Sequence, residues 1–577
     1  MKKAIIASIA FGLSIYAKAG IEIRNMTTEY ASTPIGIETA APHFCWQMYD
    51  DDFKKGHLQT AYRIKVYDEK GDTVWDSGKN AQYTSLDIAY EGRPLLPTTQ
   101  YTWQLSVWDE KANMTKSTSW FETGLNMGSL GSDARAAWGD AKWIGAENRK
   151  TLPMLRSLFD VSENAIRRAR LYITARGLYD VYINGKSITD DCLTPQASVH
   201  GDTIYYQTYD IIRYIARGKN AIGVLLGDGP SCMKDKNMAL MAKVAVVYEN
   251  GKTQTFTTNT DTWQCYSESP ILMSGLLTGE IYDATKEKFI HEWSTPWFDN
   301  TGWKRVTELP LTDKNTIIAA QPSRATRVVA PLPSTMVKTA KSNVCTYDLG
   351  REIWGVPAVR LNGLMPGTRV GINCYNADST AAAQDTYIAR GGEENYQPRF
   401  TVHRFRYIEI SNLDKPLPTG WVKGAMMHTT YQLPAYYEIP SRRVNDHYLL
   451  DSADVKILTE TFGIQQELQD ADYHHFIISP RIDTTMVYAS SYWESRYGRI
   501  ESRWHVTDNK VKYTCQVPNN SSATLFMAVP DLKIIREGGK SIKHLYGDTG
   551  YAYTNGILKV ELCAGRHEFT INRPKKK

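Results

Sequence analysis

The sequence predicts an all-β protein built from about four β-sandwich domains in series. Short segments in which polar and apolar residues alternate recur along most of the chain, as at residues 62–67 and 101–108. Turns rich in glycine, asparagine and aspartate separate these segments. The 577 residues include 35 Tyr, 15 Trp and 14 Phe, and aromatic side chains favour strands.

The charge and the N-terminal segment predict where the protein resides. The formal net charge of +5 arises mostly at the two ends of the chain, and no basic stripe runs through its body, so we expect no nucleic-acid partner. Residues 1–19 combine two lysines, an apolar stretch and small residues before position 20, as a signal peptide does. The stretch is too short to span a bilayer. We therefore expect an exported protein, periplasmic or secreted, with no membrane span.

The cysteines leave two interpretations open. All eight are scattered, without a Cys-x-x-Cys pair or the spacing of metal ligands. Export permits disulfides, and Cys192 with Cys232 or Cys345 with Cys374 are the candidate pairs. The alternative is that most of the cysteines are small buried core residues.

The first predicted domain covers residues 20–126 and is a β-sandwich. Its core is expected to contain Trp46, Trp75, Trp103, Trp108 and Trp120. Residues 129–139 are rich in small and polar side chains, which indicates a linker to the next domain.

The second predicted domain covers residues 140–320, and the third covers 321–436. An Asn184-Gly185 pair follows an alternating run, which is a strong signal for a hairpin. Strands of the second domain are expected at residues 169–175, 179–183, 221–226 and 242–248.

One segment differs from the strand pattern. Residues 441–460 place apolar side chains at helical spacing, with Ser441 as the expected N-cap. We interpret the surrounding residues 437–471 as a helical linker. Residues 472–577 return to strands, as at 511–517 and 558–562, and form the last predicted sandwich.

Motifs in every predicted domain resemble those of the bacterial α-L-rhamnosidases of glycoside hydrolase family 78. Examples are Gly-Leu-Tyr-Asp-Val-Tyr-Ile-Asn-Gly at 177–185 and Thr-Gly-Glu-Ile-Tyr-Asp at 278–283. The matching strings lie at residues 33–37, 42–46, 74–78, 120–124, 177–185, 206–210, 226–229, 278–283, 347–355, 385–388, 398–407, 497–500 and 517–523. Their number and order carry the resemblance, since each string alone is weak.

The resemblance implies a fold and an activity. The first domain is similar to the family's fibronectin III-like domain, and the second is similar to its jelly-roll, carbohydrate-binding-like domain. The third and last domains are similar to the sandwiches before and after the family's catalytic (α/α)6 barrel. Family members hydrolyse terminal α-L-rhamnosyl residues with inversion, and in some members the jelly-roll domain binds L-rhamnose with calcium.

The catalytic barrel of the family has no room in this chain. Twelve helices with their loops need on the order of 250–400 residues, whereas only residues 437–471 separate the third and last sandwiches. The family's acidic motif has no match, so no catalytic residue is assigned. Other paired carboxylates are interpreted as turn or surface residues: Glu280 with Asp283, Asp190 with Asp191, and Glu393 with Glu394.

The resemblance leaves a candidate ligand site in the second domain. Asp180, Asn184 and Asp228 lie in matched motifs near predicted turns, where their oxygens suit a sugar or Ca²⁺. Their alternative role is structural, as turn residues that hydrogen-bond backbone amides. Pro230 stands where the family often has an aromatic residue.

Two functions follow as hypotheses. In the first, the protein is inactive alone and binds a rhamnose-containing glycan or serves as a scaffold, with a separate barrel-bearing chain as one candidate partner. No cofactor is expected to be required, and calcium is the one candidate ion. In the alternative, it is an active enzyme on rhamnose-containing glycans that uses a different site between the sandwiches.

Overall fold

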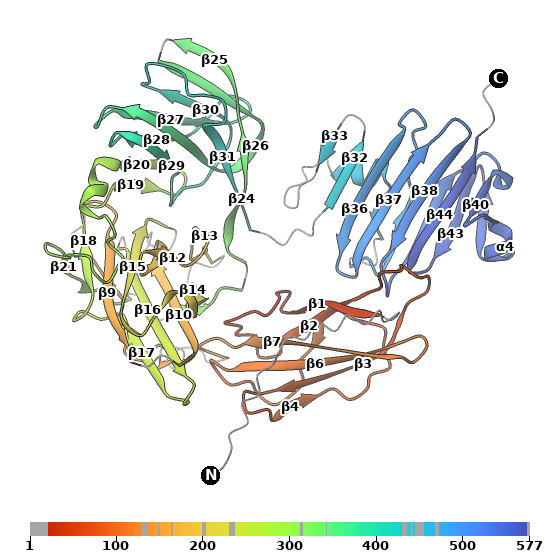
Figure 1. Cartoon of the computed structure of the whole chain (residues 1–577), viewed down its shortest axis with the longest axis horizontal. Coiled ribbons are helices and arrows are strands. Elements are labelled where there is room, and N and C mark those ends of the chain that lie inside the picture. The colour runs from red at the N-terminus through yellow and green to blue at the C-terminus, as the bar shows by residue number, and fades with distance from the viewer. Residues whose placement is uncertain are drawn as a thin grey trace.

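The computed structural model confirms an all-β protein with four sandwich-like domains (Figure 1). It describes residues 21–127, 136–147, 150–162, 165–198, 203–229, 237–311, 316–322, 324–341, 343–429, 435–439, 442–444, 455–467 and 472–573. The predicted signal peptide, Pro230, Cys232 and most of the predicted linker at 129–139 lie outside these residues. None of the described helices is long and apolar enough to cross a bilayer.

The first domain consists of two packed antiparallel sheets. One contains β1 (Glu22–Thr28), β2 (His43–Tyr49) and β5 (Ile88–Ala89), and the other contains β4 (Thr73–Asp76), β3 (Gln59–Tyr67), β6 (Gln100–Asp109) and β7 (Met114–Glu122). Trp46 and Trp103 are fully buried between the sheets, and Trp75 packs against the same core. The prediction was wrong for Trp108 and Trp120, which lie outside this core. Strand residues alternate between faces, so Trp108 points away from Trp103, and Trp120 shares the outward face.

The second domain is a sandwich of two larger sheets. One contains β22 (Thr307–Glu308), β8 (Ile144–Gly145), β16 (Ala239–Tyr248), β10 (Ile166–Arg176), β14 (Thr203–Asp210) and β23 (Ile317–Ala320), with β17 (Thr253–Thr257) on β16. The other contains β12 (Lys186–Ser187), β11 (Leu178–Ile183), β15 (Gly218–Gly227), β9 (Met154–Val161), β18 (Gln264–Tyr266) and β21 (Lys304–Arg305). The predicted hairpin is confirmed: Asn184 and Gly185 both have positive φ, at 50° and 83°.

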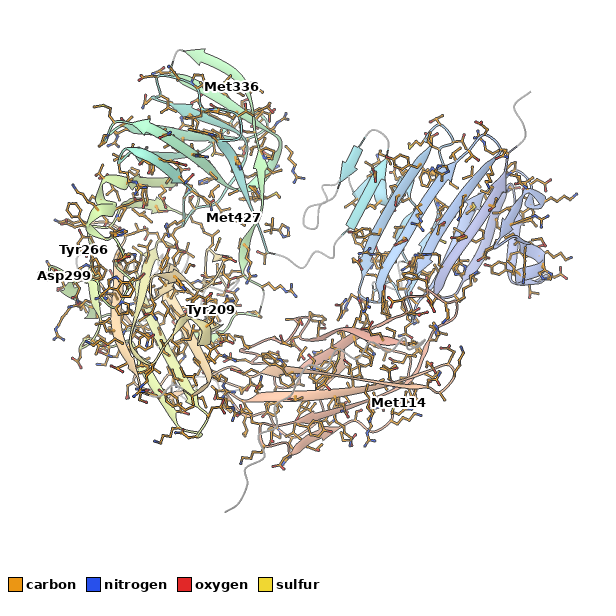
Figure 2. The ribbon with its side chains drawn as sticks, viewed as in Figure 1. Met114, Tyr209, Tyr266, Asp299, Met336 and Met427 are labelled. Carbon is orange, nitrogen blue, oxygen red and sulfur yellow. The ribbon has the colours of Figure 1, made fainter. Side chains whose placement is uncertain are left out.

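The third domain is a single hydrogen-bonded network of strands around one core. Its order is β13 (Asp191–Cys192), β24 (Thr326–Pro333), β31 (Val422–Thr429), β26 (Val344–Leu364), β30 (His403–Ser411), β27 (Arg369–Tyr375), β28 (Ala381–Ile388), β20 (Gly279–Asp283) and β19 (Ile271–Gly275), with β25 (Thr335–Lys341) and β29 (Gly392–Tyr396) on β26. Strands β13, β19 and β20 come from the range predicted as the second domain, so the two domains share a sheet. Cys192 and Leu193 pack across this junction against a small buried cluster that includes Met427, labelled in Figure 2.

The cysteines of the third domain do not form the candidate disulfide. Cys345 and Cys374 are buried free thiols. They lie on β26 and β27, which β30 separates, and they pair with Ile410 and Ile408 of β30, so they are at least two strand spacings, about 9–10 Å, apart and beyond disulfide reach. Cys192 is also free.

The last domain packs an eight-stranded sheet on a five-stranded one. The first contains β33 (Arg442–Val444), β32 (Ala435–Ile439), β36 (Tyr488–Ser495), β37 (Gly498–Val506), β38 (Lys510–Val517), β44 (Gly565–Asn572), β40 (Ile535–Glu537) and β41 (Lys540–Ser541). The second contains β34 (Ile464–Gln466), β35 (His475–Ile478), β39 (Ser522–Ala528), β43 (Ile557–Leu562) and β42 (Tyr551–Thr554).

The helix predicted at 441–460 is only partly present. Residues 442–444 form β33, because they pair with β32 instead of starting a helix at Ser441. Residues 445–454 lie outside the described residues, and a π-helical turn, η3, occupies Ile457–Thr461. Leu458 of this turn is buried in the core of the last domain. The described part of 437–471 therefore contributes both strands and a helical turn to that domain.

The first domain lies between the second and the last domains (Figure 1). Gln47 of the first domain donates hydrogen bonds to the carbonyls of Ser495 and Arg496 of the last domain, at 3.2 and 3.0 Å. Asn520 donates to the carbonyl of Tyr83 at 2.7 Å. The last domain thus folds back onto the first, although more than 400 residues separate the contacting side chains.

Candidate functional site

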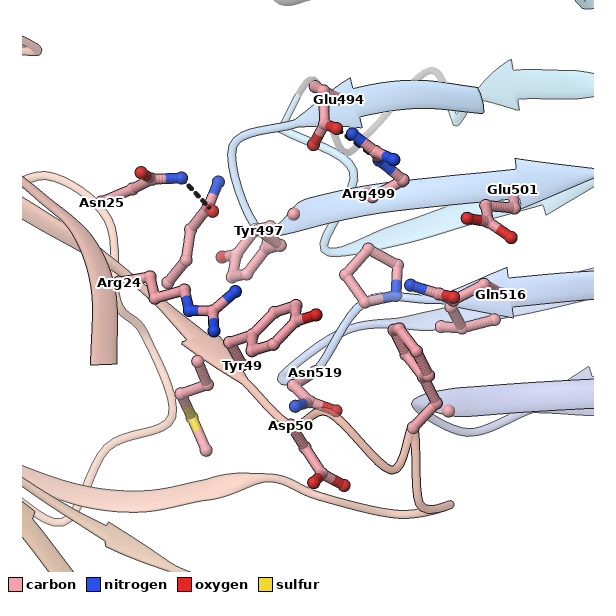
Figure 3. Close-up of a pocket in the computed structure, with 17 residues that line it drawn as sticks. Arg24, Asn25, Tyr49, Asp50, Glu494, Tyr497, Arg499, Glu501, Gln516 and Asn519 are labelled. Atoms are coloured by element: carbon pink, nitrogen blue, oxygen red, sulfur yellow. Dashed lines mark hydrogen bonds and ion pairs between the residues drawn. The ribbon is translucent and has the colours of Figure 1, made fainter. Parts of the chain in front are cut away.

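A pocket of about 310 Å³ lies where the first domain meets the last (Figure 3). The first domain contributes residues of β1, β2 and the following loop. The last domain contributes the β36–β37 hairpin and the end of β38. The lining residues that bear on ligand chemistry are Arg24, Tyr49, Phe53, Glu494, Tyr497, Arg499, Glu501, Gln516 and Asn519.

The strand register places the polar side chains of the last domain on one face. Glu494 lies opposite Arg499 across the β36–β37 hairpin, and Glu501 lies opposite Gln516 on β38. Residues two apart along a strand share a face, so Arg499 and Glu501 point the same way. Asn519 lies just after the end of β38, where the chain turns toward β39.

Several polar groups in the pocket lack partners. Asn519 is only 8% exposed, and its side chain has no hydrogen bond to any residue that the structure describes. Glu501 acts on Arg499 electrostatically but has no hydrogen-bond partner within the same part of the chain. Gln516 accepts a bond from Arg566 at 3.3 Å through its oxygen. The polar atoms of Asn519 and Glu501 are therefore available to hydrogen-bond water or a hydroxyl-bearing ligand.

Aromatic rings form the rest of the wall. Tyr49 and Tyr497 come from different domains and lie near Arg24 in the pocket (Figure 3). The Arg24 guanidinium carbon lies 3.4 Å from the centre of the Tyr49 ring. Phe53 meets Tyr49 edge to face, with 6.1 Å between ring centres. Arg24 therefore covers one face of Tyr49, and Tyr497 is only 6% exposed, so the rings can contact the C–H side of a sugar only through their remaining exposed surface.

The charges in the pocket nearly cancel. Arg499 pairs with Glu494 at 2.5 Å, and Arg24 pairs with Glu22 at 2.6 Å. Burial lowers the pKa of Arg499, but the hydrogen bond and charge of Glu494, together with the charges of Tyr492 and Glu501, outweigh it and the net pKa is raised. The lining contains two arginines, Arg24 and Arg499, and three carboxylates, Asp50, Glu494 and Glu501, so the pocket favours an uncharged ligand over an anionic one.

The structure does not bring Asp180, Asn184 and Asp228 together. Asp180 lies on β11, while Asn184 is in the hairpin four residues on, about 13 Å away along an extended strand. The Asn184 side chain accepts from the Ala221 amide at 2.9 Å and donates to the Tyr214 carbonyl at 2.9 Å. Asn184 is therefore a structural turn residue. Asp228 follows β15, at the end where Asp180 also lies.

Asp180 belongs to the junction of the second and third domains. Its carboxylate lies 3.0 Å from Nη1 of Arg399, and burial raises its pKa while Arg399 opposes the shift. Glu280 and Asp385 lie at the same junction, both almost fully buried. The Glu280 amide donates to Asp385 at 2.7 Å, and Arg399 donates its amide to Glu280 at 3.2 Å.

The other paired carboxylates have structural partners. Asp283 caps η2 (Ala284–Phe289) by accepting from the Thr285 amide, and Asp191 pairs with Arg327 at 2.7 Å. Glu394 is buried and accepts from the Tyr387 hydroxyl at 2.7 Å. Within the described residues, no group of three or more metal-ligating side chains converges.

Four protein-family models match the chain in domain order. They are the Rha78A-like N-terminal immunoglobulin domain at residues 23–127, the alpha-L-rhamnosidase N-terminal domain at 164–330, the bacterial alpha-L-rhamnosidase concanavalin-like domain at 338–428 and the bacterial alpha-L-rhamnosidase C-terminal domain at 463–541. The chain belongs to the bacterial α-L-rhamnosidase family. The resemblance inferred from the motifs is thereby confirmed.

Curated α-L-rhamnosidases share its sequence over part of their length. One from Formosa agariphila is 30% identical over 71% of this chain and 47% of the relative, and one from Streptomyces avermitilis is 34% identical over 51% of this chain and 30% of the relative. The chain thus spans about half or less of the length of these α-L-rhamnosidases.

Solved α-L-rhamnosidase structures share the fold. The enzyme from Dictyoglumus thermophilum has a TM-score of 0.78 at 18% identity, covering 96% of this chain and 99% of that one. The Streptomyces avermitilis enzyme, solved with L-rhamnose, has a TM-score of 0.78 at 16% identity, covering 96% and 100%.

Sequence reasoning missed the pocket between the first and last domains. The strings at 497–500 and 517–523 contain Tyr497, Arg499 and Asn519, but they served only to support the α-L-rhamnosidase resemblance. Their adjacency to β1 and β2 depends on domain packing, which no local pattern reveals. Asn519, a polar residue just after a strand-ending proline, was the only available signal.

Proposed function

We propose that the chain binds a neutral rhamnose-containing glycan without hydrolysing it. One observation carries the proposal: the concanavalin-like match ends at residue 428 and the C-terminal match begins at 463. The longest helical run among the described residues, 455–461, has only seven residues. The described residues between these domains therefore contain no barrel of long helices. In the family this barrel carries the catalytic acid and base, so the described chain has no site for them.

The interdomain pocket supports binding. It joins aromatic faces to unpartnered carboxylate and amide groups, which is the combination a pyranose requires. The Streptomyces avermitilis α-L-rhamnosidase was solved with L-rhamnose, and this makes a rhamnoside the first ligand to test. We further propose export of the protein, on the features of residues 1–19.

The purified chain is expected to release no L-rhamnose from an aryl α-L-rhamnoside. Glu280 and Asp385 are almost fully buried, and in the interdomain pocket Glu494 is held by its ion pair with Arg499, so we assign no acid–base pair. The assay should include the Formosa agariphila relative as a positive control. A turnover of about 1–1000 per second, the usual enzyme range, would favour the alternative of an active enzyme. If turnover appeared only after a barrel-bearing chain was added, the proposed function would change from glycan binding to a subunit of an assembled enzyme.

Substitutions in the pocket are expected to weaken glycan binding. Glu501→Gln removes the charged acceptor and Asn519→Ala removes the amide, so each should lower affinity by about 10-fold or more. Isothermal titration of the full chain with rhamno-oligosaccharides, with calcium and with a chelator, measures the change.

Asp228→Asn in the second domain is the matched control for the two pocket variants. It should leave affinity unchanged if the sugar binds between the first and last domains. Loss of binding in Asp228→Asn alone, together with a requirement for calcium, would move the site to the second domain.

A further inference from the structure

A cleft of about 580 Å³ lies between the first and second domains, apart from the pocket described above. Its floor is one face of the sheet that contains β10, β16 and β17. Its wall is the part of the first domain formed by the turn after β3 and the loop before β6. Binding sites for small molecules occupy about 300–1,000 Å³, so the cleft has the size of a ligand site.

The strand register brings polar side chains of three strands together on this floor. Leu171 of β10 points into the core of the second domain, so Tyr172 points out of that core. Tyr172 lies directly opposite Lys243 of β16, and such antiparallel neighbours have Cβ atoms about 4.5–5.5 Å apart. Ala245, two residues after Lys243, lies opposite Thr255 of β17. These side chains therefore share one face of the sheet and line one cleft.

Three arginines at the cleft are already neutralised. They pair with carboxylates as follows: Arg167 and Arg168 with Glu69, and Arg170 with Glu122 and Asp210. Three guanidinium groups thus face three carboxylates, so these six side chains together add no net charge to the cleft.

Lys243 lacks a carboxylate partner. Its Nζ donates to the carbonyl of Ala137 at 2.7 Å, and it forms no ion pair with any residue that the structure describes. Since an ammonium group carries three N–H donors, two remain for a ligand. Burial lowers the pKa of Lys243, and no nearby carboxylate opposes this shift. An anion beside Lys243 therefore offsets the cost of burying its charge.

The remaining charged residues of the lining do not cancel the charge of Lys243. Lys70 has no ion pair within the described part of the chain. Asp68 accepts hydrogen bonds from the amides of Lys70 and Asp72, at 2.9 and 3.0 Å, and so stabilises its own turn. Two lysines against one carboxylate leave the cleft with one positive charge in excess.

Tyr172 supplies a further hydrogen-bond donor. Its side chain is only 2% exposed and lines the cleft, yet its hydroxyl bonds to no residue that the structure describes. Burial and the charge of Glu122 raise the pKa of Tyr172, so the hydroxyl stays protonated. Lys243 and Tyr172 thus offer unused donors side by side. Carboxylate and sulfate oxygens accept hydrogen bonds only, which makes an oxyanion the complementary group.

We propose that this cleft is a second binding site, in which Lys243 and Tyr172 hold the carboxylate or sulfate group of a small ligand. The ammonium group provides charge-assisted hydrogen bonds, which are about twice as strong as neutral ones. The cleft differs in the sign of its charge from the pocket between the first and last domains, where carboxylates outnumber arginines. Binding in the cleft is independent of neutral glycan binding in that pocket.

Isothermal titration of the full chain with D-glucose, D-glucuronate and D-glucose 6-sulfate tests the proposal, because the three sugars share a ring and differ in charge. The buffer contains no phosphate or sulfate, which would compete. At least one anionic sugar should bind at least about 10-fold more tightly than D-glucose. Binding of only one of them identifies a carboxylate or a sulfate as the group recognised. Equal affinity for D-glucose, or no heat from either anionic sugar up to about 10 mM, would overturn the proposal.

Two variants locate the binding. Lys243→Gln should weaken binding of the anionic sugar at least about 10-fold, and Tyr172→Phe should weaken it about 3-fold or more. Lys512→Gln is the matched control, because it also removes one positive charge but lies in the last domain, where Lys512 pairs with Glu568 at 3.2 Å. This control should bind as the wild type does. Unchanged affinity in folded Lys243→Gln would also contradict the proposal, and if that variant does not fold, Tyr172→Phe decides.

Discussion

Arg170→Met is expected to lower the free energy of unfolding by about 3–5 kcal/mol, because it leaves a buried carboxylate without its partner. Arg170, on β10 of the second domain, donates from Nε and Nη2 to the two carboxylate oxygens of Glu122, each at 2.9 Å. Glu122, on β7 of the first domain, has no exposed surface. Arg168 remains nearby at 3.7 Å but lacks the two-bond geometry. Denaturant unfolding followed by circular dichroism measures the loss.

The matched control for this prediction is Arg63→Met. Arg63 makes a similar two-bond contact with Asp76, but on the surface, where about 40% and 32% of the two side chains stay exposed. Exposed pairs contribute about 0–1 kcal/mol, so this variant should unfold almost as the wild type does. The double variant Arg170→Met with Glu122→Leu should recover much of the loss. Equal effects of the two single variants would show that the buried pair does not hold the domains together.

The sequence predicted the fold well where local patterns decide the structure. Alternation at 101–108 and 511–517 placed β6 and β38, and Asn184-Gly185 placed a hairpin whose positive φ angles it can adopt without strain. These features depend on residues within one or two strands. The same periodicity should have excluded Trp108 from the core that contains Trp103, because positions five apart in a strand face opposite ways.

Sequence patterns gave wrong or incomplete predictions where pairing or packing between distant strands determines the structure. Residues 442–444 have helical periodicity with their neighbours, but pairing with β32 places them in a sheet. Arg170 meets Glu122, Gln47 meets Ser495 and Lys55 meets Glu537 across domain boundaries. The pocket is built from such contacts, so its residues could be recognised as family motifs but not as one site. Asp180, a predicted ligand residue, pairs with Arg399 of the next domain, a contact that the local sequence pattern does not reveal.

The junction around Asp180 contains two carboxyl groups whose environment opposes their ionisation. Burial, with the nearby Asp385 carboxyl, raises the pKa of Glu280 to about 8, although the Arg399 amide lowers it. Burial likewise raises the pKa of Asp385 to about 7. Both groups are at most 1% exposed. The folded protein therefore holds protons here that the unfolded chain would release near pH 4–5.

The free energy of unfolding of the wild type is expected to fall as pH rises, and Glu280→Gln is expected to remove this fall. Between about pH 4.5 and 8 the folded state binds more protons at Glu280 than the unfolded state, so the free energy of unfolding falls across this window and levels off above it. The neutral amide cannot ionise, so at pH 9 the variant should exceed the wild type by about 3–5 kcal/mol, and at pH 4 the two should be similar. Denaturant unfolding at a series of pH values measures both curves. Glu393→Gln, a surface neighbour with 57% of its side chain exposed, should keep the wild-type slope. A Glu280→Gln curve parallel to the wild type from pH 4 to 9 would show that Glu280 ionises in the folded junction without penalty.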